Sequence, residues 1–247
     1  MKKIATPLML AMSLAMAGNA FAQAAPAEPA STLSFNAGAV NEYRYRGISQ
    51  SRFDPAVQGG ADYADKSGAY VGIWGSSIKW IKDSGGKSNT EVDIYGGYKF
   101  AVGDFAYDVG FLRYEYSGNA LPVSANTTEL YGAVTLGLVT LKYSQSTGNL
   151  FGFAKSKGST YIDLTATYDL GGGYTFAPHI GYQQVKGADN KAFSYADTSF
   201  TLGKDLGDGL TASAALISTN AKTGSYISPA GKQLGKAGMV VGIKYTF

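Results

Sequence analysis

The chain has 247 residues, with 21 Lys and Arg, 18 Asp and Glu, one His and no Cys. The lack of Cys excludes disulfides and thiolate metal sites, and one His leaves no His pair, so metal chemistry would rest on carboxylates alone and no cofactor is expected. A hydrophobic content of 45% excludes a disordered chain. With 33 Gly and 18 Tyr, the composition favours one β domain with tight turns.

Residues 1–22 have the pattern of a cleaved secretory signal peptide. Two lysines precede an apolar run that ends near Ala17, and small residues precede a cleavage site after Ala22. An N-terminal membrane anchor is the alternative, but it needs about 20 apolar residues, and this run is shorter. We therefore expect a flexible periplasmic lead-in over 23–32 and the folded domain over 33–247.

Cleavage would also change the charge of the working protein. The mature chain loses two of the 21 basic residues and none of the 18 acidic ones, so its formal charge is +1. Nucleic-acid binding proteins carry a strongly basic face. We therefore expect no nucleic-acid partner.

Alternation of apolar and polar residues predicts β-strands along the rest of the chain. Over 90–100, for example, Val92 and Ile94 alternate with Glu91 and Asp93, a period of two that a helix does not produce. About twelve segments have this pattern: 33–46, 55–64, 69–77, 90–100, 105–116, 127–137, 139–146, 160–170, 174–184, 195–204, 210–218 and 238–247.

Two of these segments depart from regular alternation. Segment 69–77 is apolar on both faces, and segment 105–116 changes phase near Phe111. A β-bulge at that point would return Arg113 and Glu115 to the polar face. We therefore expect a bulge near Phe111.

The connections between segments alternate between short and long along the chain. Short turns lie at 65–68, 101–104, 137–138, 171–173 and 205–209, and long connections at 47–54, 78–89, 117–126, 147–159, 185–194 and 219–237. This asymmetry is typical of outer-membrane barrels, which have short periplasmic turns and longer extracellular loops. A soluble β-sandwich has no reason to alternate so regularly.

Aromatic residues of the apolar phase should collect at two heights of such a barrel. The short-turn end has Phe100, Phe105, Tyr168, Tyr174, Phe176, Tyr245 and Phe247, and the long-loop end has Tyr43, Tyr45, Tyr114, Tyr116, Tyr143 and Tyr182. The fold class predicted is therefore all-β: a transmembrane antiparallel up-and-down β-barrel of about 12 strands in the cell outer membrane.

The last segment ends in an aromatic residue at the C-terminus. Tyr245 and Phe247 close an alternating strand, an ending similar to the assembly signal of bacterial outer-membrane proteins. A chance aromatic ending is the alternative. We expect these two residues to direct the chain to the barrel-assembly machinery.

Three motifs resemble those of a known family. An Arg-Gly turn within 45–51, a Gly-x-Tyr-x-Gly-x-Trp-Gly-Ser pattern over 68–76 and a Glu-x-Asp-x-Tyr pattern within 91–98 follow one another. In this order they resemble the TorF-type porin family of Gram-negative bacteria. The similarity extends over nearly the whole mature chain and is most specific in its N-terminal third. The resemblance implies an outer-membrane barrel and a transport role, and it supplies no catalytic residues.

If the apolar phase faces lipid, the charged residues face the lumen. The inward set is Glu42, Arg44, Arg46, Asp62, Glu91, Asp93, Lys99, Asp108, Arg113, Glu115, Glu129, Lys142, Asp163, Asp169, His179, Asp197 and Lys244. Because acids outnumber bases in this set, a channel lined by it should weakly prefer cations. In the alternative, charges pair between strands, for example Arg44 and Arg46 with Asp62, and close the lumen.

The long connections carry a different sign of charge. Their lysines are Lys79, Lys82, Lys87, Lys155, Lys157, Lys186, Lys191, Lys222, Lys232 and Lys236. The expected partner is phosphorylated outer-leaflet lipid, that is, lipopolysaccharide. Two alternatives are a solvated loop surface and attraction of anionic solutes to the mouth.

An enzyme is the competing function class, because some outer-membrane barrels are lipid hydrolases. A serine hydrolase needs a base beside its nucleophile, and the single candidate base, His179, has Ala177 and Gly181 as its same-face strand neighbours. Glu91 and Asp93 share a face, but acidic strand faces are common inside barrels. The tract 171–173 joins strands, whereas phosphate-binding glycine loops lead into helices. We expect neither catalytic residues nor a metal site.

The sequence therefore predicts an outer-membrane, porin-like passive channel for small hydrophilic solutes or ions. The alternative is a plugged structural or surface-interaction barrel with basic extracellular loops. The oligomeric state and the solute are left open.

Overall fold

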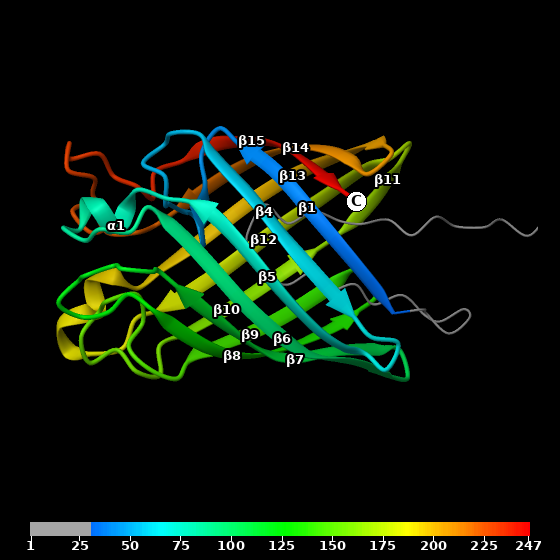
Figure 1. Ribbon diagram of the computed structural model, residues 1–247, viewed down its shortest axis with the longest axis horizontal. Coiled ribbons are helices and arrows are strands. Elements are labelled where there is room, and N and C mark those ends of the chain that lie inside the picture. Colours follow the sequence, from blue (N-terminus) through cyan, green and yellow to red (C-terminus); the bar gives the residue numbers. More distant parts are fainter. Residues whose placement is uncertain (1–30) are drawn as a thin grey trace, which may run out of the picture.

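Residues 31–247 are described in the computed structural model, and they form a closed antiparallel β-barrel (Figure 1). The main sheet has 13 strands, and β10 (Thr160–Ala166) and β11 (Tyr168–Gly171) are successive parts of one wall strand, so the barrel has 12 wall strands. Pairing of β10 with β12 (Tyr174–Gln184) closes the sheet. The predicted fold class is confirmed. The predicted signal peptide, residues 1–22, lies outside the described residues.

The remaining wall strands follow the chain around the barrel, each antiparallel to its neighbours. They are β1 (Thr32–Val40), β4 (Ala56–Ala64), β5 (Ala69–Ser77), β6 (Thr90–Val102), β7 (Phe105–Glu115), β8 (Thr127–Leu136), β9 (Val139–Ser146), β13 (Tyr195–Gly207), β14 (Leu210–Thr219) and β15 (Gly238–Thr246). Two short helices, α1 (Trp80–Asp83) and η1 (Ala188–Phe193), lie in the long connections. No helix of the described chain is long and apolar enough to cross a membrane.

Alternation along each wall strand separates a lipid face from a lumen face. On β6 the side chains of Ile94 and Tyr98 are 42% and 45% exposed on the outside, whereas Glu91 and Asp93 are 1% and 0% exposed on the inside. A two-residue period places successive side chains on opposite faces of the sheet. The polar phase of the sequence therefore lies within the barrel, and the apolar phase faces the membrane.

The C-terminal residue joins the two ends of the barrel wall. The backbone N–H of Phe35 donates to the carbonyl of Phe247 at 2.8 Å, and the N–H of Phe247 donates back at 2.9 Å. The two rings stack with centroids 5.9 Å apart. The first and last strands are thereby paired, and both begin or end at the short-turn end of the barrel, where the C-terminus lies (Figure 1).

The first wall strand is shorter than the predicted segment 33–46, because the chain leaves the wall after Val40. Beyond Val40, the Asn41 side chain hydrogen-bonds to the backbone of β15. Its Nδ2 donates to the Met239 carbonyl at 3.1 Å, and its Oδ1 accepts from the Val241 N–H at 2.8 Å. Residues 41–55 then turn into the lumen, and we call this segment the inner hairpin. Its strands are β2 (Arg44–Tyr45) and β3 (Ile48–Ser49).

Two residues form the tip of the inner hairpin. Arg46 and Gly47 both have positive φ, 46° and 80°, as a type I′ turn requires. A Cβ atom on Gly47 would overlap the methyl group of Thr219 on the barrel wall. Glycine is therefore required at the tip both by backbone conformation and by space.

The predicted bulge in β7 is absent, and this corrects the facing of its last residues. The strand pairs in continuous register with β6 and β8, with Leu112 buried inside and Phe111 exposed outside. Arg113 and Glu115 therefore lie on the outward face, and their prediction as channel-lining residues is wrong. Leu112 instead packs in one core cluster with Tyr43 of the inner hairpin, which makes the lumen apolar at this point.

The aromatic girdle at the long-loop end is also smaller than predicted. Tyr143 and Tyr182 are exposed on the outside, as expected. Four others belong to the interior core cluster instead: Tyr43, Tyr45, Tyr114 and Tyr116. At the short-turn end, Phe100, Phe105, Tyr168, Tyr174, Tyr245 and Phe247 are exposed on the outside as predicted, whereas Phe176 is half-buried.

Candidate functional site

The inner hairpin bonds to the wall of the barrel through Glu91 on β6. The Tyr43 hydroxyl donates to Glu91 Oε1 at 2.6 Å, and the Tyr116 hydroxyl donates to Oε2 at 2.7 Å. All three side chains are buried. The carboxylate of Glu91 is thus used to hold the hairpin, and it is not free to meet a solute while the hairpin is in place.

The tip of the hairpin is held on the far side of the lumen by Arg46. Its Nη2 and Nη1 donate to the two carboxylate oxygens of Glu129 on β8 at 2.7 and 3.1 Å, and Nη1 also donates to Gln183 Oε1 on β12 at 2.5 Å. The guanidinium lies 4.1 Å from the ring centroid of Tyr161 on β10. We call Arg46, Glu129 and Gln183 the latch. It connects a hairpin that starts at β1 with strands of the opposite wall.

Arg46 has an unfavourable backbone conformation, and the contacts of its side chain offset this cost. A left-handed conformation costs a non-glycine residue about 1–2 kcal/mol, and Arg46 has a φ of 46°. Glycine or asparagine would fill such a turn position with less strain. The bidentate pair with Glu129 is a strong, geometrically specific contact that offsets this cost.

Further contacts join the hairpin to neighbouring loops. Arg44 pairs with Glu42 at 2.8 Å and donates to the Lys236 carbonyl at 2.7 Å. Ion pairs Arg52–Asp83 and Lys79–Asp54 connect the base of the hairpin with the β5–β6 connection. The Lys79 ammonium holds the pKa of the Asp54 carboxyl below its usual range. The hairpin is thus attached both at its tip and at its base.

The layer around the latch is closed to solvent. Residues that point inward from the wall at this height are all less than 10% exposed, namely Glu91, Asp93, Tyr114, Glu129, Tyr161 and Gln183. Both carboxylate oxygens of Asp93 are buried and lack a hydrogen-bond partner among residues 31–247. In the conformation described, the inner hairpin fills the lumen at the level of the latch.

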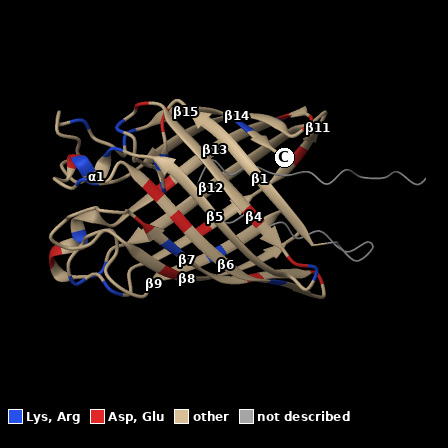
Figure 2. Cartoon of the chain, viewed as in Figure 1, with Lys and Arg blue, Asp and Glu red and all other residues tan. Residues whose placement is uncertain are grey.

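Below the latch, toward the short turns, the wall strands carry charged residues of both signs (Figure 2). The hydroxyl of Tyr95 donates to Asp62 at 2.5 Å, and the Lys142 ammonium lies 3.9 Å from the ring centroid of Tyr131. Asp62, Lys142 and Asp163 are partly exposed. This lower lumen is therefore polar and accessible from the periplasmic side of the hairpin.

The predicted channel-lining residues fall into three groups. Six lie on wall strands and point inward: Asp62, Glu91, Asp93, Glu129, Lys142 and Asp163. Three belong to the inner hairpin: Glu42, Arg44 and Arg46. Arg44 and Arg46 pair with Glu42 and Glu129, and not with Asp62 as the alternative supposed.

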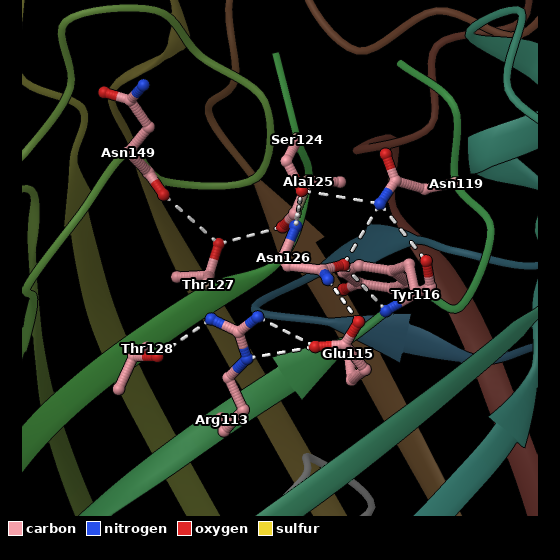
Figure 3. Close-up of polar contacts among 10 residues, drawn as sticks. All are labelled: Arg113, Glu115, Tyr116, Asn119, Ser124, Ala125, Asn126, Thr127, Thr128 and Asn149. Atoms are coloured by element: carbon pink, nitrogen blue, oxygen red, sulfur yellow. Dashed lines mark hydrogen bonds and ion pairs between the residues drawn. The ribbon is translucent and has the colours of Figure 1, made fainter. Parts of the chain in front are cut away.

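The third group, Arg113 and Glu115, lies on the outside at the rim of the barrel (Figure 3). Arg113 Nη2 donates to Glu115 Oε2 at 2.8 Å, and Nη1 donates to the Thr128 hydroxyl at 3.1 Å. The Asn126 amide donates to the other oxygen of Glu115. At this height the outward face can carry charge, because the two residues neutralise each other beside the loops.

Sequence reasoning missed two parts of the latch site. Gln183 and Tyr161 lie on the inward phase of their strands, and their neutral side chains gave no signal of a partner. A partial signal was present at the hairpin tip, where Gly47 follows a charged residue in the turn. That pattern predicted a turn, but it did not indicate that the turn lies inside the barrel.

His179 has no arrangement that would activate a serine. Its Nε2 lies 2.5 Å from Asp163 Oδ2, and its Nδ1 lies 3.6 Å from Asp197 Oδ1. Ser199 lies opposite His179 in the β12–β13 register, but both ring nitrogens face carboxylates. His179 therefore belongs to the polar lining of the lumen. Within residues 31–247 no group of three or more His, Cys, Asp or Glu side chains is arranged so that it could hold a metal ion.

Comparison with solved structures places the fold among porin-like outer-membrane barrels. The "KdgM porin" aligns with a TM-score of 0.55 at 10% identity over 88% of this chain and 99% of that chain. The "NanC porin" aligns with a TM-score of 0.55 at 12% identity over 87% of this chain and 99% of that chain. A further structure is entitled "KdgM porin in complex with disordered oligogalacturonate". At these identities the likeness establishes the fold alone.

The chain belongs to the family described as "Bacterial protein of unknown function (Gcw_chp)", whose family model matches residues 23–247. This description assigns no activity to the family, so family membership does not establish the transport role that the TorF-type resemblance implies. A search of curated proteins returned no match.

The latch predicts unequal effects for two Arg–Glu pairs of the same chain. In Arg46→Met, Glu129 is left buried without its counter-charge, which should lower the free energy of unfolding by about 3–5 kcal/mol. Arg113→Met breaks a half-exposed pair and should cost about 0–1 kcal/mol. Urea unfolding of the refolded barrel in lipid vesicles measures both.

The double variant Arg46→Met/Glu129→Leu removes both buried charges together, and it should recover most of the stability lost in Arg46→Met. Equal losses for Arg46→Met and Arg113→Met would contradict the assignment of the latch.

Proposed function

We propose that the protein is an outer-membrane channel for small hydrophilic solutes, closed by the inner hairpin and opened when the hairpin leaves the lumen. The single observation that carries the proposal is the polar lumen of a closed barrel, filled at one height by a segment attached through side-chain contacts. Barrels of about 8 strands fill with wall side chains, whereas those of 16 or more enclose wide channels. At the intermediate size of this barrel, one inward segment is sufficient to decide whether the lumen is open.

The lining supports a weak preference for cations in the open form. Once the hairpin leaves, Glu91 and Glu129 lose their partners on it and become charged groups of the wall, beside the already unpaired Asp93. Lysines lower in the lumen, Lys142 and Lys244, oppose this charge. Acidic rings favour cations in pores, so the acids near the latch would set the sign of selectivity.

A plugged structural barrel is the second candidate, and the closed layer around the latch favours it. In that case the hairpin never leaves, and the basic loops contact lipopolysaccharide or another surface. Loop lysines recur at the long-loop end of the barrel (Figure 2). The two candidates differ in whether release of the latch produces a current.

The channel proposal predicts a larger current when the latch is broken. In planar bilayers, Arg46→Met and Glu129→Gln should each raise the open fraction or unit conductance of the refolded protein several-fold, because the hairpin loses its far attachment. Arg113→Met should match the wild type. With a KCl gradient, the reversal potential of the open form should indicate cations, and Asp93→Asn should shift it toward anions.

Silence of the wild type and both latch variants, with each shown to be folded by heat-modifiable migration on a detergent gel, would refute the channel and support the plugged barrel. An unchanged current in the latch variants would show that the hairpin does not control conduction.

We also propose that Tyr245 and Phe247 act as the signal read by the assembly machinery. Both rings are exposed on the outside, and Phe247 pairs with β1 through its backbone. Phe247→Ala should reduce the heat-modifiable barrel recovered from the outer membrane several-fold. Phe200→Ala removes a similarly exposed outward ring from the middle of the wall and serves as the control. Equal recovery of the two variants would contradict a special role for the C-terminus.

A further inference from the structure

Five long connections of the barrel meet above the inner hairpin, which is the sixth, and together they line a half-open cavity of about 540 Å³. Each connection contributes to its lining, and Ile48, Ser49 and Gln50 of the hairpin form part of it. These connections lie at the end of the barrel opposite the C-terminus (Figure 1). Segments far apart in sequence thus converge on one half-open space at the extracellular mouth.

Aromatic rings form two sides of this cavity. On one side Trp80 and Tyr116 meet edge to face with centroids 5.2 Å apart. On the other side Phe193 lies 4.6 Å from Phe153 and 5.5 Å from Tyr226, measured between ring centroids. The five rings come from five different connections, so the cavity depends on the packing of loops against one another.

The two tyrosine hydroxyls among these rings are directed to partners within the protein, whereas the buried Nε1 of Trp80 has no hydrogen-bond partner among residues 31–247. The Tyr116 hydroxyl donates to Glu91 at 2.7 Å, and the Tyr226 hydroxyl donates to the Phe193 carbonyl at 2.7 Å. Burial raises the pKa of the Tyr226 hydroxyl, which therefore stays neutral. Asp83 also reaches the lining, but its carboxylate pairs with Arg52. The phenylalanine and tyrosine rings therefore offer their carbon faces to an occupant.

Two of the lining rings stand on strained backbone. Phe151 and Tyr226 have φ values of 44° and 46°, a left-handed conformation that bulky residues rarely adopt. Such strain persists where the surrounding structure holds it and often marks a functional site. As with Arg46 at the latch, a large side chain occupies a position at which glycine would be less strained.

We propose that this extracellular cavity binds an uncharged small molecule with an aromatic or other apolar ring. Its volume falls in the range of ~300–1,000 Å³ found for small-molecule sites. Among the described residues, the lining contains neither Lys nor Arg, so it has no counter-charge for an anionic ligand. This ligand differs in chemistry from the hydrophilic solutes proposed for the lumen, and the inference does not depend on conduction.

The test is equilibrium dialysis of the full-length mature barrel in lipid nanodiscs, with empty nanodiscs as the reference and 2-naphthol as the probe. Wild type should bind 2-naphthol saturably at one site per barrel. The anion 2-naphthalenesulfonate, which has the same ring system, should bind at least about tenfold more weakly because its charge would be desolvated without a partner.

Matched substitutions locate the site. Ile227, which lines the cavity, and Leu138, at a turn on the other end of the barrel, are 52% and 54% exposed. Ile227→Glu should weaken 2-naphthol binding by about tenfold or more, since it adds a charge to the cavity, whereas Leu138→Glu should bind as wild type does. Phe193→Ala, which removes a ring without adding charge, should also weaken binding.

Three results would overturn the inference. They are uptake equal to that of empty nanodiscs, wild-type binding by both folded variants Ile227→Glu and Phe193→Ala, and binding of the sulfonate or of methyl glucoside as tight as that of 2-naphthol. Heat-modifiable migration shows that each variant is folded before binding is compared.

Discussion

The internal organisation of this barrel depends on a buried ion pair between a loop and the opposite wall. Arg46 and Glu129 have side chains that are only 7% and 2% exposed. Two charges removed from water are costly unless they meet with good geometry and further hydrogen bonds. Here the bidentate contact, the Gln183 amide oxygen and the ring of Tyr161 supply those conditions. Once the hairpin moves away, Glu129 on the wall loses its counter-charge. This loss costs free energy and favours the closed form.

This arrangement divides the interior into two compartments of different chemistry. Below the hairpin, charges of both signs line a partly exposed lumen. Above it, aromatic rings from the loops surround an apolar cavity. The hairpin contributes to both compartments, through Arg46 to the polar layer and through Ile48 to the cavity. A molecule bound above would contact the element that closes the space below, so its binding and the position of the hairpin would be linked.

Much of the wall could be predicted from sequence because a two-residue period directly reports which face each residue occupies. Segments 69–77, 139–146 and 174–184 coincide with β5, β9 and β12. The alternation of short and long connections predicted the topology. These signals are local, and a barrel repeats them strand after strand.

The inner hairpin could not be predicted in the same way, because its residues continue the alternation of β1. The pattern of Glu42, Arg44 and Arg46 is the one expected for a continued lumen face of β1. No local feature of the sequence indicates that the Asn41 side chain bonds to β15 and that the chain leaves the wall there. The error in β7 has the same origin. A polar lumen was assumed, whereas Leu112 and Tyr114 face a lumen that the hairpin makes apolar. Side chains that meet across the barrel are set by long-range packing, which periodicity does not report.

The central claim is that the inner hairpin closes the lumen by staying against the wall. Because the chain has no native Cys, a pair introduced as Ile48→Cys and Tyr195→Cys, whose side chains share one core cluster, can tether the hairpin to β13. Single-channel recording of this variant tests the claim directly. The account predicts that oxidation abolishes the current and that a reductant restores it. Identical current steps under both conditions, with the disulfide verified on a gel, would contradict it.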